Sequence, residues 1–187
     1  PGFYADGEYD VAGFIVGIVP RRNLIDGRTI VPGDVLIGLP SSGLHTNGYS
    51  LARRIAFDEA RLQPDTIVPE LRRSIGDALL APHRSYLPVI RPLLTEHVIK
   101  GMAHITGGGI TDNLPRILPA GTDAVINRSG WEPPPIFKWL QRTGQVPEAD
   151  MLRTFNMGIG LILACDAAEE QRLQKALKAA GETSAVR

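Results

Sequence analysis

The feature that most constrains this chain is an apolar run, residues 102–105, that leads through Thr106 into three consecutive glycines, Gly107, Gly108 and Gly109. Beyond them, apolar residues recur at the spacing of one helix face, at Ile110, Leu114, Ile117 and Leu118. The pattern predicts a strand, a tight turn and a helix. Because glycines carry no side chains, their N–H groups can converge on an anion, so the turn is a candidate phosphate site. A turn that binds nothing is the alternative, since the spacing matches neither a Walker loop nor a dinucleotide fingerprint.

A second polar loop follows the buried strand that we expect over residues 34–39. Residues 41–50 contain three serines, a threonine, an asparagine and a histidine. Turn chemistry and a helix N-cap by Thr46 or Asn47 explain one or two of them. They do not explain His45, so we expect this loop to bind a ligand, as loops at strand ends often do. We expect residues 41–50 and 104–110 to lie on one face of the molecule.

Strands and helices alternate along the chain, which at 187 residues suits one domain of ordinary size. This order predicts an α/β (α+β) layered sandwich, in which a mixed β-sheet carries flanking helices. Strands are expected over residues 10–19, 34–39, 102–105, 123–127 and 161–165. Helices are expected from about residue 49, over residues 70–80, from residue 83 with an interruption at Pro92, from about residue 111, and near residues 136–140, 147–153 and 167–180.

Charge and cysteine content exclude several classes of function. Lysine plus arginine (20) balance aspartate plus glutamate (20) without a basic cluster, so we expect no nucleic-acid partner. The single cysteine, Cys165, lies in an apolar run and is expected to be buried and inert; without a second cysteine, a reducing compartment is favoured. No window approaches ~18 continuous apolar residues, so a cytoplasmic protein without a membrane span is expected. The four histidines are scattered along the sequence, and their spacing predicts no metal site.

Six ordered segments resemble the phosphoribosylformylglycinamidine cyclo-ligase family, also called the aminoimidazole ribonucleotide synthetase family. They are residues 9–14, 33–39, 41–51, 104–109, 113–116 and 153–158, so the resemblance extends over nearly the whole chain. Two positions depart from the family pattern. Leu44 stands where familiar members carry proline, and His83 stands where they carry threonine. The second departure puts a substrate contact in doubt.

The resemblance implies that the chain is a C-terminal portion of a longer protein. Residues 1–20 would be the last strand and loop of an N-terminal domain, and residues 21–187 a C-terminal α/β domain without its closing strand. In such enzymes the N-terminal domain supplies the nucleotide loop, the metal-binding aspartates and the sheet of a homodimer. The chain is therefore expected to hold half of an active site and to be inactive alone. Its first residue is Pro1, and residues 184–187 look like the start of another strand.

Enzymes of this family use ATP and Mg²⁺ to close the imidazole ring of 5-aminoimidazole ribonucleotide from formylglycinamidine ribonucleotide. Phosphorylation of the formyl oxygen makes it a good leaving group when the amidine nitrogen attacks. The resemblance implies His45 as the catalytic residue that exchanges a proton at the formyl or amidine group. The implied substrate-binding residues are Ser42, Asn47, Ser50, Arg53, Arg84, His104 and Thr106, the implied phosphate-binding residues are Gly107, Gly108 and Gly109, and Asp10 is the candidate for placing the metal-nucleotide.

Two alternatives stay open. The first is an ATP-dependent phosphotransferase of the same superfamily, of the thiamine-monophosphate kinase or selenophosphate synthetase type. The second is a binding module without chemistry. The role of Asp10 is also open, because this residue is either a carboxylate of the site or a solvated residue at a strand end.

Overall fold

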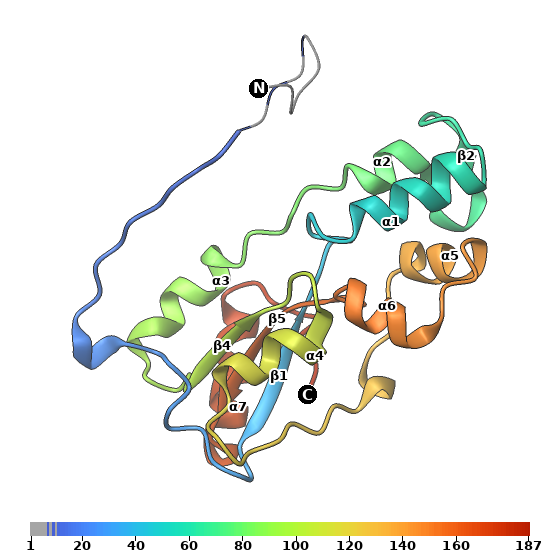
Figure 1. Cartoon of the computed structure of the whole chain (residues 1–187). Coiled ribbons are helices and arrows are strands. Elements are labelled where there is room, and N and C mark those ends of the chain that lie inside the picture. The colour runs from blue at the N-terminus through green and yellow to red at the C-terminus, as the bar shows by residue number, and fades with distance from the viewer. Residues whose placement is uncertain (1–6, 8, 10) are drawn as a thin grey trace.

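The computed structural model describes residues 7, 9 and 11–187, and its central element is a three-stranded sheet (Figure 1). The strands are β1 (Val35–Pro40), β4 (Gly101–His104) and β5 (Ile159–Cys165), in the spatial order β1-β5-β4. Both β1 and β4 pair antiparallel with β5, which is buried along its whole length. Consequently β1 and β4 run in the same direction, and the carboxyl ends of both lie at one edge of the sheet.

Helices surround this sheet, so the expected layered architecture of a sheet with flanking helices is confirmed. The α-helices are α1 (Tyr49–Arg53), α2 (Ile75–Leu79), α3 (Leu87–Ile90), α4 (Gly109–Asn113), α5 (Pro135–Thr143), α6 (Glu148–Thr154) and α7 (Glu170–Ala179). A π-helical segment (Arg54–Glu59) continues α1, and 3₁₀ segments lie at Arg21–Asn23, Pro69–Leu71, Arg91–Thr95, Leu114–Ile117, Arg128–Gly130 and Ala167–Glu169. A small antiparallel hairpin pairs β2 (Ile67–Val68) with β3 (Arg73–Ser74).

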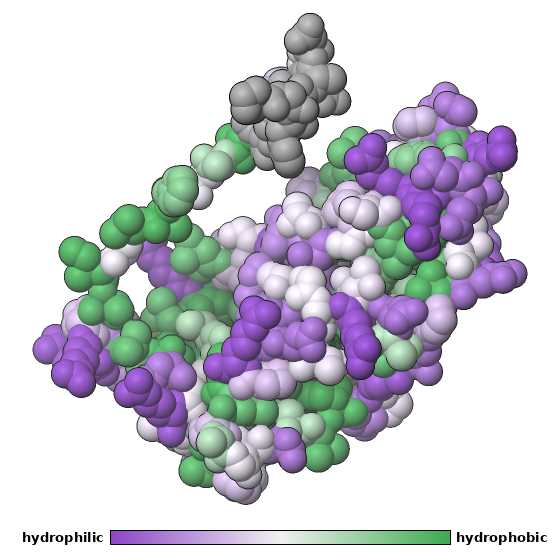
Figure 2. Space-filling view, in the orientation of Figure 1, coloured by the Kyte–Doolittle hydropathy of each residue, from purple (hydrophilic) through white to green (hydrophobic). Residues whose placement is uncertain are grey.

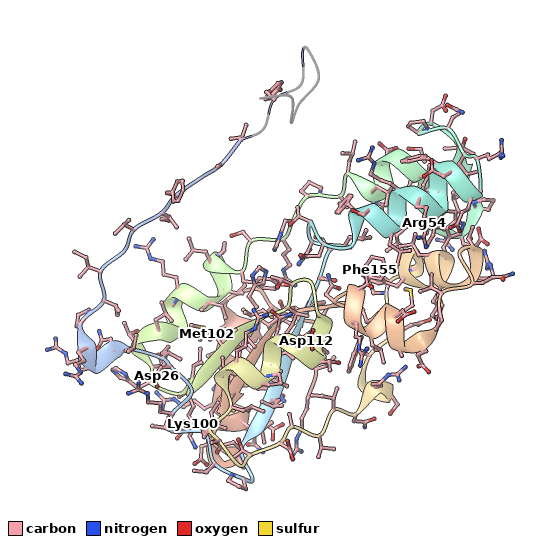
Figure 3. The ribbon with its side chains drawn as sticks, viewed as in Figure 1. Asp26, Arg54, Lys100, Met102, Asp112 and Phe155 are labelled. Carbon is pink, nitrogen blue, oxygen red and sulfur yellow. The ribbon has the colours of Figure 1, made fainter. Side chains whose placement is uncertain are left out.

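Three groups of buried apolar side chains hold these elements together. Because strand residues alternate between faces, Ile37 and Leu163 pack on one side of the sheet with Leu173 of α7, and Ile162 packs on the other side with Leu114. The third group lies among α1, α2, α5 and α6 and includes Phe137 and Phe155, whose ring centroids are 5.7 Å apart. Figure 3 shows Phe155 where these helices meet the rest of the chain.

The strand expected over residues 10–19 is not formed. Residues 11–20 have neither strand nor helix assignment, and Asp10 lies outside the described residues. Figure 1 shows this segment extending away from the sheet, and Figure 2 shows its apolar surface. Phe14 is 97% exposed and Ile18 is 100% exposed. A strand needs a neighbouring strand for its backbone hydrogen bonds, and β1, β4 and β5 lie elsewhere. The predicted domain division near residue 20 stays a prediction.

Two other expected elements differ from the structure. Residues 123–127 have no strand assignment; the side chains of Ala124 and Ile126 pack inward while Val125 is exposed. These residues have the periodicity of a half-buried strand, but they form no backbone pairing with a neighbouring strand among the described residues. The helix expected over residues 70–80 is shortened to α2, because Arg72 adopts a left-handed conformation with φ of 53°. Ser74 caps α2 by accepting a hydrogen bond from the Asp77 N–H at 3.0 Å.

The helix expected from residue 83 begins only at Leu87, and residues 81–86 carry neither helix nor strand assignment, whereas the interruption near Pro92 and the burial of Cys165 are confirmed. Helix α3 gives way to a 3₁₀ segment at Pro92, and Cys165 is a buried free thiol whose pKa burial raises to about 11. Val186 forms an antiparallel bridge with Gly38, so the end of the chain does add an extended residue beside β1.

Candidate functional site

The two loops expected to carry the site lie side by side at the edge of the sheet where β1 and β4 end. The loop after β1 leads into α1, and the segment after β4 leads into α4. A hydrogen bond joins them directly, because the Gly107 N–H donates to Oδ1 of Asn47 at 2.9 Å. Nδ2 of Asn47 donates to the His45 carbonyl at 2.7 Å. One amide side chain thus connects both loops, and the prediction that they share one face is confirmed. The N-cap of α1 is Gly48, neither Thr46 nor Asn47.

His45 lies inside the first loop, with a side chain 1% exposed and a φ of 54°. Its Nε2 accepts hydrogen bonds from the backbone N–H of Ser42 at 2.9 Å and from that of Arg84 at 3.3 Å. These donors assign the proton of the neutral ring to Nδ1, which is buried and has no partner among the described residues. Burial first, and then the nearby His83, His104 and Arg84, lower the pKa of His45 to about 4. The ring is therefore neutral at pH 7.

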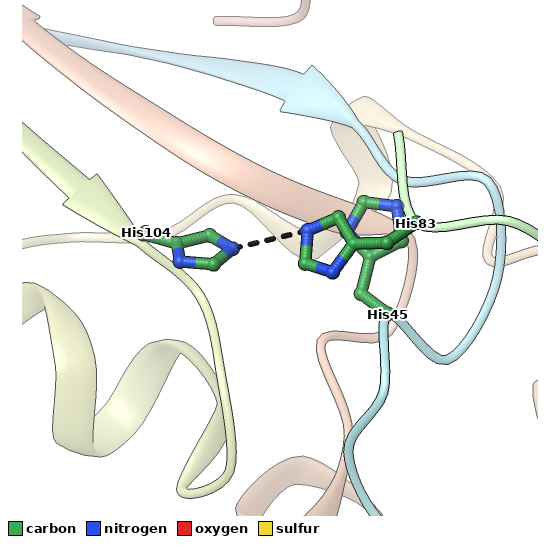
Figure 4. Close-up of side chains that lie close together, drawn as sticks. All are labelled: His45, His83 and His104. Atoms are coloured by element: carbon green, nitrogen blue, oxygen red, sulfur yellow. Dashed lines mark hydrogen bonds between the residues drawn. The ribbon is translucent and has the colours of Figure 1, made fainter. Parts of the chain in front are cut away.

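Three of the four histidines gather at this edge (Figure 4). The rings of His45 and His83 stack with centroids 4.1 Å apart, and Nε2 of His83 lies 3.3 Å from Nε2 of His104. His83 and His104 are exposed, so His83 covers the buried ring. The sequence spacing predicts no metal site and gives no sign of this cluster, because the three histidines are distant in sequence and meet only in the fold. The available signal was position, since each of the three stands beside the end of a predicted strand or helix.

A buried asparagine that the sequence analysis did not select holds the first loop in place. Asn156 is 1% exposed, and its Nδ2 donates to the Gly43 carbonyl at 2.8 Å. Its Oδ1 accepts from the Ser41 hydroxyl and from the Gly158 N–H, each at 2.8 Å. The side chain thus links the loop after β1 to the segment before β5. Asn156 lies in the motif 153–158, but the motif alone does not reveal its burial.

A second buried asparagine holds the glycine turn. Nδ2 of Asn113 donates to the carbonyl of Gly109 at 2.8 Å and to that of Gly107 at 3.2 Å, and its Oδ1 accepts from the Thr106 hydroxyl at 3.0 Å. The Gly109 N–H donates to the Thr106 carbonyl at 3.1 Å. The N–H groups of Gly107 and Gly109 therefore have protein partners already. Phosphate binding by Gly107, Gly108 and Gly109 stays a prediction, and a contribution from the Gly107 N–H would require that group to exchange Asn47 for a phosphate oxygen.

Arg84, one of the expected substrate-binding residues, has its guanidinium engaged inside the protein. Its Nη1 donates to the Pro40 carbonyl at 3.0 Å, and its Nη2 pairs with the carboxylate of Glu182. The guanidinium also lies 5.1 Å from the ring centroid of Tyr86. Because Glu182 is only 4% exposed, its charge needs this counterion, and a phosphate would have to compete with it.

The other predicted residues fall into two groups. Ser42 and Thr106 lie in the two joined loops, and the Ser42 hydroxyl donates to the Pro82 carbonyl at 2.7 Å. Ser50 and Arg53 are exposed on α1, three residues apart, so they share one face of that helix. A cavity of about 650 Å³ lies elsewhere, along Leu36, Gly38, Trp131 and Val186, and its lining does not include the histidines.

The buried imidazole predicts a specific loss of stability in acid. The pKa of His45 is about 4 in the folded chain and near 6.5 in its ordinary state, so folding favours the neutral ring. The stability that the neutral ring contributes is complete above pH 6.5 and is lost as the pH falls towards 4. The free energy of unfolding then decreases by roughly 2–3 kcal/mol. Urea unfolding at the two pH values measures it. We expect a smaller loss in H45N and an unchanged loss in H97A, which alters the exposed histidine outside the cluster. An equal loss in H45N would contradict this account.

In the part of the chain that the structure describes, no helix is long and apolar enough to cross a membrane.

Similar proteins are named phosphoribosylformylglycinamidine cyclo-ligase. One from Desulfitobacterium hafniense (strain DSM 10664 / DCB-2) is 54% identical over 182 residues, which cover 97% of this chain and 53% of the relative. One from Geotalea uraniireducens (strain Rf4) is 52% identical over 164 residues, covering 88% and 47%. An Arabidopsis thaliana protein, whose name adds "chloroplastic", is 47% identical over 178 residues, covering 95% and 46%.

The chain spans about half the length of these relatives. A family described as AIR synthase related protein, C-terminal domain, matches residues 31–187, which include both loops and all three clustered histidines. With most of its length matched, the chain belongs to the AIR synthase related family and corresponds to the C-terminal domain of its members.

Proposed function

We propose that this chain carries part of the active site of an ATP-dependent cyclo-ligase that forms 5-aminoimidazole ribonucleotide from formylglycinamidine ribonucleotide in purine biosynthesis. The observation that carries the proposal is the hydrogen bond from the Gly107 N–H to Asn47, which joins the histidine loop to the glycine turn. The names of the relatives support the same reaction. They give no support to a phosphotransferase of the thiamine-monophosphate kinase or selenophosphate synthetase type.

The reaction requires a site that orients an anionic substrate. ATP transfers its γ-phosphoryl group to the formyl oxygen, the amidine nitrogen attacks the formyl carbon, and the C–O bond to phosphate breaks. In the proposed site Ser42, Asn47 and Ser50 orient the ribonucleotide through hydroxyl and amide groups. The exposed Arg53 supplies a cation for its phosphate, and Thr106 lies beside the reacting group.

The structure changes the role that we propose for His45. A ring that is 1% exposed and covered by His83 does not reach a substrate in this arrangement. Its hydrogen bonds with the backbone of Ser42 and Arg84 support a positioning role instead. Burial and the nearby His83 lower the pKa of His104, so this exposed imidazole is neutral. We propose that it contacts the substrate directly.

ATP and Mg²⁺ belong to this proposal, but the clustered residues do not suit Mg²⁺. Magnesium takes oxygen ligands in octahedral geometry, whereas the histidine cluster in the described residues offers imidazole nitrogens. We therefore assign no Mg²⁺ ligand and no step to this cluster.

We further propose a cytoplasmic homodimer for the complete protein, without nucleic-acid or membrane partners. The exposed apolar segment 11–19 supports a contact with further protein.

Release of ADP by the purified complete protein tests the proposal. We expect release that depends on formylglycinamidine ribonucleotide, and we expect H104A to lower kcat/KM at least about tenfold because a substrate contact is lost. H97A is the matched control and should retain wild-type turnover. ADP release that needs thiamine monophosphate instead would establish the phosphotransferase alternative. Measurable turnover by the isolated 187-residue chain would contradict the view that it holds half of the site.

A further inference from the structure

The histidine cluster contains a pair of nitrogen atoms at an informative distance. Nε2 of His83 and Nε2 of His104 are 3.3 Å apart (Figure 4). Two imidazole nitrogens bound tetrahedrally to one zinc ion at ~2.0–2.1 Å are separated by about 3.3 Å. The pair is therefore spaced as two ligands of one ion, and in the ion's absence the same spacing allows one ring to donate to the other.

A third imidazole lies beside this pair, but its ring is stacked on His83 with an interplanar angle of 17° and must turn before one of its nitrogens can face the same ion. One ring nitrogen from each of His45, His83 and His104 can be chosen so that all three lie within 4.8 Å of one another. Nδ1 of His45 is buried and has no hydrogen-bond partner in the part of the chain that the structure describes. An orphaned buried nitrogen is costly, and coordination of an ion would remove that cost.

Ligation by His45 also requires a proton to move within its ring. A metal-bound Nδ1 leaves the proton on Nε2, which is 3.0 Å from the Ser42 hydroxyl oxygen. That hydroxyl donates its own proton to the Pro82 carbonyl and can therefore accept another. The N–H groups of Ser42 and Arg84 then lose their acceptor, so loading costs two backbone hydrogen bonds and an approach of His45 towards the other two rings. We expect His83 and His104 to supply most of the affinity.

The donor set selects the class of ion. Neutral imidazoles bind zinc, cobalt, nickel and copper, whereas calcium and magnesium require oxygen ligands. His83 and His104 are exposed, so solvent ions reach them and their side chains can adjust. The only cysteine, Cys165, is buried in the sheet and does not compete.

We propose that His45, His83 and His104 bind one divalent transition-metal ion, with zinc as the representative and the fourth position left to water. The inference concerns binding by the folded chain and does not rest on the proposed cyclo-ligase activity. It does predict a conflict with that activity, because the ion would occupy His104.

Titration of the full chain with Zn²⁺ by calorimetry, and with Co²⁺ by visible absorption, tests the site. We expect one ion per chain and the absorption bands of four-coordinate cobalt. Loss of one ligand in H83A or H104A should weaken zinc binding by at least about a hundredfold, and loss of His45 by about tenfold. Both His83 and His104 are exposed, so these variants are expected to fold, and far-UV circular dichroism checks this.

H97A provides the control, because His97 is the one histidine outside the cluster. It should bind zinc as tightly as the wild type. Unchanged binding in H83A, weakened binding in H97A, or no saturable binding by the wild-type chain would each overturn the proposal. Zinc binding by a complete protein that lacks cyclo-ligase activity would support the site and refute only the proposed function.

Discussion

Replacement of Gly109 by alanine is expected to lower the free energy of unfolding by about 4 kcal/mol, the largest effect of any glycine substitution in the turn. Gly109 has a φ of 61°, which strains any side chain. A Cβ atom built there would lie 1.9 Å from the Leu152 carbonyl oxygen and 2.9 Å from that of Phe155. Both obstacles are backbone atoms of α6 and its end, so α4 must move away from α6. Urea unfolding followed by circular dichroism measures the loss.

Gly107, two residues before Gly109, supplies the matched control. A Cβ atom there would meet only Oδ1 of Asn47, at an ordinary 3.6 Å. The Gly107 N–H would keep its hydrogen bond with Asn47, so G107A should cost less than about 1 kcal/mol. Equal losses in the two variants would mean that the turn depends on glycine for chain flexibility and not for its contact with α6.

This comparison separates two explanations of the glycine turn. A phosphate site needs backbone N–H groups that are open to a ligand, whereas close packing needs the absence of a Cβ atom. Gly109 serves close packing, because its N–H is bonded to the Thr106 carbonyl and its Cα lies against α6. Gly107 is the exposed member of the turn, so a ligand-binding role would depend mainly on it.

The placement of the two loops could be predicted from the sequence because it depends on local patterns. Apolar runs marked β1, β4 and β5, and polar loops directly followed two of them. The strand expected over residues 10–19 could not be judged this way, since a strand forms only where another strand offers its backbone. The break at Arg72 was equally hidden, because the apolar spacing of residues 70–80 continues through a left-handed residue.

The histidine cluster and the buried asparagines needed the tertiary structure. His83 is 38 residues from His45 and 21 from His104, and no periodicity relates the three positions. Asn113 and Asn156 are polar residues in short motifs, which by composition resemble ordinary turns. Their importance lies in burial and in the number of their hydrogen bonds, neither of which is encoded locally.

Replacement of Asn156 by alanine should accordingly destabilise the chain by about 3–4 kcal/mol. The substitution removes the hydrogen bonds of Ser41, Gly43 and Gly158 to one side chain that is 1% exposed. A buried donor or acceptor left without a partner costs ~1–3 kcal/mol, and the Gly43 carbonyl and the Gly158 N–H are backbone groups that cannot turn to solvent. The expected loss therefore exceeds that of one ordinary hydrogen bond.

Asn127 is the matched control, because its side chain accepts from the Ser129 N–H and hydroxyl on an exposed 3₁₀ segment. N127A loses a cap and should cost about 1 kcal/mol. Urea unfolding of both variants gives the comparison, and the acid sensitivity assigned to His45 gives a second measurement. If Asn156 fixes the loop that buries His45, N156A will expose the imidazole and reduce the stability lost between pH 6.5 and 4. A destabilised N156A with wild-type acid sensitivity would mean that the loop keeps its conformation without Asn156, and that residues 41–47 are held by Asn47 and Arg84 instead.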